Sequence, residues 1–88
     1  MARTLTAVER LQRAREIIQA AFELPVPEEV GRLDLTYMAT VRGMLAEARD
    51  LVKFIAYSPS ASEATKQEAL EIIQLADQTK KEIFKTGA

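Results

Sequence analysis

Residues 34–57, with the sequence DLTYMATVRGMLAEARDLVKFIAY, decide the fold of this chain. Their apolar side chains recur every seven residues in three neighbouring rows. The rows are Tyr37, Met44 and Leu51; Met38, Leu45 and Val52; and Val41, Ala48 and Ile55. A seven-residue apolar repeat is typical of helices that pack at a small angle. Because this stripe is three rows wide, it suits the core of a helical bundle better than a two-stranded coiled coil.

A first helix is predicted over about residues 5–23. Thr6 and Glu9 fit a capping box, in which the hydroxyl accepts from the amide three residues on and the glutamate reaches back. Pro25 ends the helix, because the residue before a proline disfavours helical geometry. The expected core face comprises Ala7, Leu11, Ala14, Ile18, Ala21 and Phe22.

Two helix starts follow Pro25. Pro27 suits a first helical position, with Glu28 and Glu29 next to the positive helix end, and Asp34 suits an N-cap. We predict a short helical turn near residues 27–32 and then the long helix over residues 34–57. A single helix that begins at Pro27 is the alternative.

A third helix is predicted over about residues 60–85. Its start has two candidates: Ser60 with Glu63 as a capping box, or Ser58 as N-cap with Pro59 at the first helical position. Its expected core face comprises Ala69, Ile72, Ile73, Ala76, Ile83 and Phe84.

These segments predict one all-α domain over residues 1–88, a three-helix up-down-up bundle. Eighty-eight residues are too few for two independently folded units of ordinary size. The short connection around Ser58–Ser62 makes the second and third helices an antiparallel hairpin. We expect broad apolar stripes on these two helices, which the shorter first helix leaves partly uncovered.

The composition argues against an enzyme. The chain has no cysteine and no histidine, which removes thiol nucleophiles, zinc-finger ligands and the commonest general base. The carboxylates fall at helix starts or on polar faces, where capping and solvation explain them. We therefore expect no catalytic residues, no metal and no cofactor.

Charge and hydropathy point to a protein of the cytoplasm. The formal net charge is −1, which gives no global field to attract nucleic acid or an anionic membrane. No apolar run approaches the 18 or so residues that a membrane span needs.

The outer side of the second helix is the candidate interaction surface. Small residues lie opposite the apolar stripe, and a mid-helix glycine costs roughly 1 kcal/mol relative to alanine. The alternative interpretation is that another helix wraps this side, or that Phe54 is a single exposed aromatic. The candidate interface residues are Ala39, Gly43, Ala46, Phe54, Tyr57, Leu70 and Leu75.

We therefore expect a small non-enzymatic interaction module that self-associates through its second and third helices, with a dimer favoured, or that binds a helical protein partner. The alternative is a small nucleic-acid-binding regulator that uses arginine stripes of the first two helices. Interleaved acidic residues make that alternative less favoured. The candidate basic residues are Arg3, Arg10, Arg13, Arg42, Arg49 and Lys53.

Overall fold

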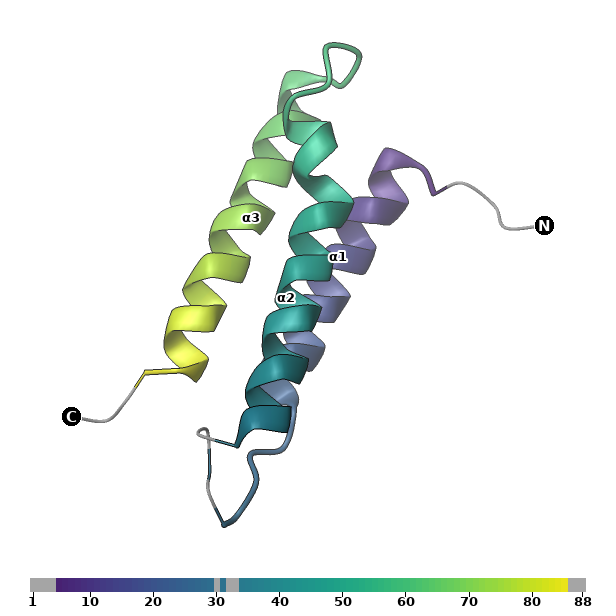
Figure 1. Cartoon of the computed structure of the whole chain (residues 1–88). Coiled ribbons are helices and arrows are strands. Elements are labelled where there is room, and N and C mark those ends of the chain that lie inside the picture. The colour runs from purple at the N-terminus through teal and green to yellow at the C-terminus, as the bar shows by residue number, and fades with distance from the viewer. Residues whose placement is uncertain (1–4, 30, 32–33, 86–88) are drawn as a thin grey trace.

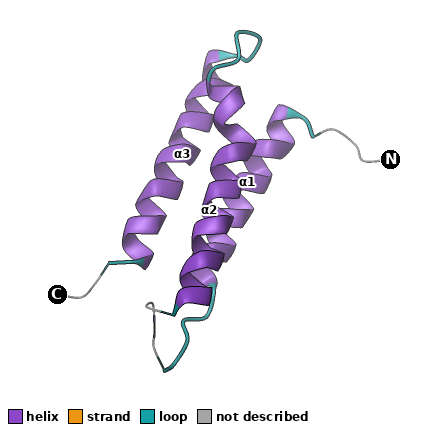
Figure 2. Ribbon diagram, in the orientation of Figure 1, coloured by secondary structure: helices purple, strands orange, loops and turns teal. Residues whose placement is uncertain are grey.

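The computed structural model describes residues 5–29, 31 and 34–85 of the chain. Three helices make up the fold: α1 (Ala7–Glu23), α2 (Leu35–Ala56) and α3 (Glu63–Ile83). Successive helices run in opposite directions (Figure 1), and the described residues contain no strand (Figure 2). The predicted all-α, up-down-up bundle is confirmed.

Helix α1 begins where the sequence predicts. The Thr6 hydroxyl accepts from the Glu9 amide at 3.1 Å, and the Glu9 carboxylate accepts from the Thr6 amide at 3.0 Å, which completes the capping box. The helix ends at Glu23, and Leu24 before Pro25 is extended, as expected for a residue preceding proline.

The predicted core face of α1 is partly wrong. Ala7 is exposed, and Phe22 is 59% exposed, whereas Ile17 is buried. The stripe turns toward Ile17 because α2 packs against that side of α1, where the Arg10 guanidinium donates to the Leu51 carbonyl at 3.4 Å.

The described part of the connection from α1 to α2 contains a turn and one left-handed residue. Residues 28–29 form a turn, and Gly31 has φ +57°, a left-handed conformation that favours glycine. Residues 30 and 32 of the predicted helical turn near 27–32 lie outside the described residues. The single helix beginning at Pro27 is wrong, because Asp34 is the N-cap of α2 and accepts from the Tyr37 amide at 2.8 Å.

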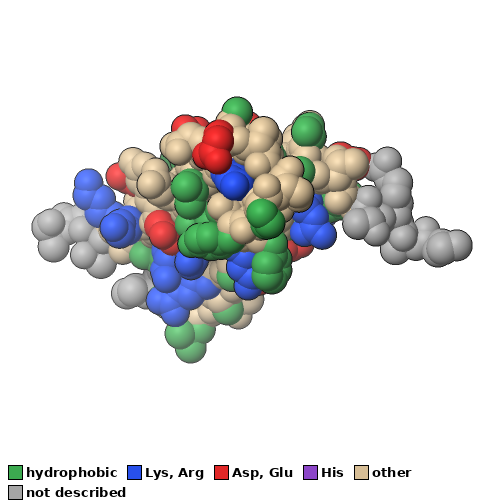
Figure 3. Space-filling view, turned by 90° about the horizontal axis from the view of Figure 1, so that it is seen from above, with side chains coloured by type: hydrophobic (Ala, Val, Ile, Leu, Met, Phe, Trp, Pro, Cys, Tyr) green, Lys and Arg blue, Asp and Glu red, His purple; other side chains and the backbone are tan. Residues whose placement is uncertain are grey.

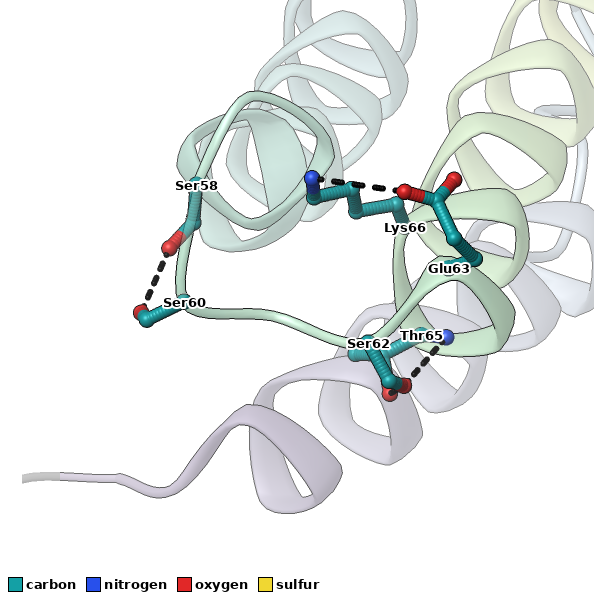
Figure 4. Close-up of polar contacts among 6 residues, drawn as sticks. All are labelled: Ser58, Ser60, Ser62, Glu63, Thr65 and Lys66. Atoms are coloured by element: carbon teal, nitrogen blue, oxygen red, sulfur yellow. Dashed lines mark hydrogen bonds and ion pairs between the residues drawn. The ribbon is translucent and has the colours of Figure 1, made fainter.

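Both predicted starts of α3 are wrong. The N-cap is Ser62, whose hydroxyl accepts from the Thr65 amide at 3.1 Å (Figure 4). Ser58 and Ser60 instead share a hydrogen bond of 3.0 Å within the connection. Glu63 serves as the first helical residue, where its charge suits the positive helix end, and Lys66 lies 3.7 Å from it.

Helix α2 lies between the other two and packs closely on both, while α1 and α3 contact each other less. The nine positions of its seven-residue repeat are all buried or half-buried, which confirms the predicted stripe. Across the bundle, Ile72 of α3 and Val41 and Val52 of α2 are fully buried. Full burial of side chains this size stabilises the fold by about 1.5–3 kcal/mol each.

The described helices cover the broad apolar stripes of α2 and α3 in part. Most positions are buried, while Met44, Leu51, Ile73 and Phe84 are half-buried. The expectation that a second chain covers the remainder stays a prediction.

Candidate interaction surface

The outward side of α2 is open along its whole length. Ala39, Gly43 and Ala46 follow one another at spacings of four and three residues and are all exposed. Phe54 is 73% and Tyr57 80% exposed near the end of the same helix. The alternative that α1 or α3 wraps this side is excluded for the described part of the chain.

Leu35 extends this surface to the start of α2. It is 81% exposed and lies four residues before Ala39, which places it on the same side of the helix. Leu35 is not among the predicted interface residues, although its spacing from Ala39 indicates the same side of the helix. We call the strip formed by Leu35, Ala39, Gly43, Ala46, Phe54 and Tyr57 the outer face.

Gly43 has no role within this chain that requires a glycine. A Cβ atom built at this position meets no atom within 4 Å, and the residue is in ordinary helical geometry. Gly31, by contrast, has a positive φ that explains it. Gly43 therefore costs helix stability without any internal packing in return.

Charged side chains lie next to the aromatic residues of the outer face. The Lys53 ammonium lies 5.3 Å from the centre of the Phe54 ring and 3.1 Å from a carboxylate oxygen of Asp50. Tyr57 borders a hollow together with Lys53 and Ile73, at the junction of α2 and α3. The two aromatic side chains thus remain largely open to solvent with polar groups at their edge.

The two leucines predicted on α3 do not share one surface. Leu70 and Leu75 are 37% and 38% exposed, but five residues of helix separate them by about 140°. Leu75 lies two turns beyond Glu68, which accepts from Arg15 of α1 at 3.2 Å, so it faces the α1 side. Leu70 lies one turn before Ile73 and belongs to the α2 side, nearer the outer face.

Acidic side chains lie between the basic residues of α1 and most of the basic residues of α2. Arg10 and Arg13 line hollows between α1 and α2 in which carboxylates are interleaved with them. Those carboxylates are Glu9, Glu16, Glu47 and Asp50. The two predicted arginine stripes therefore do not form one continuous basic surface, and Arg3 lies outside the described residues.

The structure instead joins the basic residues of α2 to lysines of α3. Arg42 and Arg49 border hollows that Lys80 and Lys81 border from the opposite side. This grouping depends on the antiparallel register of α2 and α3, so the spacing within one helix could not predict it. On the face seen from above (Figure 3), Lys and Arg side chains also lie along the lower side, with hydrophobic ones among them.

Two negative findings apply to the described residues. They contain no group of three or more Asp and Glu side chains placed to hold a metal ion. None of the helices is both long and apolar enough to cross a membrane.

Comparisons with protein-family models, with curated proteins and with solved structures gave no match.

Proposed function

We propose that this protein is a non-enzymatic interaction module that dimerises through the outer face of α2. The observation that carries the proposal is Gly43, an exposed mid-helix glycine that nothing inside the chain requires. Small residues at the centre of a helix face allow a second helix to approach closely. The exposed Leu35, Phe54 and Tyr57 supply larger apolar area at the two ends of the same strip.

The pattern of the outer face favours an antiparallel pair of α2 helices related by a two-fold axis. In this arrangement Ala46 of one copy meets Ala46 of the other, Gly43 lies one turn from the axis, and Leu35 of one copy lies opposite Tyr57 of the other. A parallel pair would instead place Asp50 against Asp50 and Lys53 against Lys53, and like charges directly opposed repel. A two-fold dimer is also the commonest closed assembly.

Several parts of this proposal rest on sequence composition. The lack of catalytic groups and a location in the cytoplasm are predictions from the absence of cysteine and histidine and from the hydropathy pattern. Nucleic-acid binding by the arginines of α1 and α2 is the less favoured function. It requires a surface that the structure divides between separate hollows.

Sedimentation equilibrium tests the self-association. We expect a reversible monomer–dimer equilibrium at tens of micromolar protein. A single monomeric species throughout that range would contradict the proposal.

Disulfide trapping tests the arrangement of the dimer. The chain has no cysteine, so single substitutions give unambiguous products. Ala46→Cys lies near the proposed two-fold axis and should cross-link to its own copy under mild oxidation, because a disulfide needs Cα atoms about 4.4–6.8 Å apart. Leu35→Cys and Tyr57→Cys should cross-link to each other when mixed, but neither to itself.

The end positions distinguish the two orientations clearly. Residues 35 and 57 are separated by 22 helical positions, or about 33 Å along the axis at 1.5 Å per residue. Efficient self-linking of both Leu35→Cys and Tyr57→Cys would therefore show a parallel pair. Ala20→Cys, on the exposed side of α1, is the matched control and should stay unlinked.

A further inference from the structure

A groove between α2 and the second half of α3 collects cations from both helices. One hollow of about 480 Å³ is lined by Arg42, Asp77, Lys80, Lys81 and Phe84. A second, adjoining hollow shares Arg42, Asp77 and Lys80 and continues toward Arg49. We call the two hollows together the basic groove. The larger hollow falls within the size range of small-molecule sites.

The groove has a marked excess of positive charge. Its lining holds four cations and one carboxylate, a net charge of +3, although the whole chain carries −1. The single carboxylate, Asp77, lies 3.7 Å from a guanidinium nitrogen of Arg49. Arg42, Lys80 and Lys81 form no ion pair with any described residue. Within the lining, Asp77 alone offsets the mutual repulsion of the four cations.

The helix dipole explains only half of this cluster. Lys80 and Lys81 occupy the last turn of α3, where a cation suits the negative helix end. Arg42 and Arg49 lie in the body of α2 and gain nothing from that effect. Their place opposite the lysines follows from the antiparallel packing, which brings Arg49 to Asp77 and, seven residues away on each helix, Arg42 to Phe84.

Arg42 is held in position by an aromatic ring. Its guanidinium carbon lies 5.4 Å from the centre of the Phe84 ring. A guanidinium above a ring keeps its N–H donors available at its edge, and this planar fork matches the oxygens of a phosphate. Leu45 and Ala76, both buried, form an apolar floor on which charge interactions are less screened than in water.

We propose that the basic groove binds a ligand with linked phosphate groups. Two arginines and two lysines spread along the groove suit several neighbouring phosphates better than a single anion. The ligand's negative charge relieves the repulsion among Arg42, Lys80 and Lys81, which form no ion pair with any described residue. The cations lie on the α3 side of α2, and Ala46 borders both the groove and the outer face.

Titration with inorganic tripolyphosphate at low salt, followed by backbone amide NMR, tests the proposal. We expect the largest shifts at Arg42, Arg49, Asp77 and Lys80. The double variant Lys80→Gln with Lys81→Gln should weaken binding by about tenfold. The control Arg13→Gln with Lys66→Gln removes the same charge outside the groove and should change binding by no more than about twofold.

Removing the carboxylate of Asp77 tests the proposal by strengthening the binding of phosphate. Asp77→Asn removes the one negative charge of the groove and releases Arg49, so it should tighten tripolyphosphate binding by about threefold or more. Equal losses in the test and control double variants would contradict the proposal. So would binding of a short oligothymidylate at these residues with no binding of tripolyphosphate, because the groove would then belong to a nucleic acid strand.

Discussion

The inward and outward faces of α2 belong to one helix but differ in almost every property. Inward positions such as Val41, Leu45 and Val52 carry branched side chains and are at most 3% exposed. Outward positions such as Ala39, Gly43 and Ala46 carry almost no side chain and are open to solvent. The inward face explains the fold by itself, whereas the outward face has no explanation within the monomer. The difference separates residues that stabilise this chain from residues that are free to serve a second one.

The largest expected effect tests the inward face. Leu45→Ala should lower the free energy of unfolding by about 3 kcal/mol, because it leaves a cavity between the helices. Leu35→Ala makes the same change on the same helix at an exposed position and should cost less than about 0.5 kcal/mol in the monomer. Urea unfolding of both variants measures the contrast. Similar losses would show that the two faces are not energetically distinct.

The second largest effect on stability is expected at the N-cap of α3. Ser62→Ala should cost about 1 kcal/mol, because it removes the hydroxyl that accepts from the Thr65 amide. Ser58→Ala and Ser60→Ala remove only an exposed contact between two loop hydroxyls and should change stability by a few tenths of a kcal/mol. Thermal unfolding of the three variants distinguishes the observed cap from the two predicted ones. If Ser60→Ala lost the most stability, the result would support the predicted capping box of Ser60 and Glu63 instead.

On the outward face, one substitution is expected to raise the stability of the monomer. Gly43→Ala should raise the free energy of unfolding of the monomer by about 0.8 kcal/mol, because the added Cβ meets open space and alanine favours the helix. The measurement needs protein dilute enough to be monomeric. A loss of stability there would show that Gly43 has an internal packing role.

The smallest effect tests the weak contact between α1 and α3. Arg15 and Glu68 form an ion pair of 3.2 Å, but both side chains are nearly half exposed. A double-mutant cycle with Arg15→Gln and Glu68→Gln should give a coupling of about 0.5 kcal/mol that falls with added salt. A coupling that does not respond to salt would point to a buried interaction.

The sequence predicts the fold well because its strongest signals are periodic. The seven-residue rows of α2 identify the buried positions, and the Thr6–Glu9 capping box and Asp34 identify two helix starts. The start of α3 could not be chosen among several serines, because each suits an N-cap and the structure of the loop decides between them. Spacing alone predicts Phe22 in the core, because it does not show on which side of α1 the next helix packs.

The candidate surfaces were predictable to different degrees. The outer face of α2 follows from one helix, so its spacing was visible in the sequence. The basic groove needs the register between α2 and α3, which brings Arg42 to Phe84 and Arg49 to Asp77. That register is a property of packing, and residues 28 and 42 positions apart carry no local signal of it.

The most direct test of the outer face is the Gly43→Leu variant, compared with the wild-type chain by sedimentation equilibrium. A leucine at this position adds helix propensity to the monomer but fills the space into which a second helix would pack. We expect the variant to be at least as stable toward unfolding when monomeric and to lose the dimer. Ala20→Leu adds the same side chain to the exposed side of α1 and should leave the dimer unchanged. A Gly43→Leu dimer as tight as that of the wild type would contradict the proposed interface.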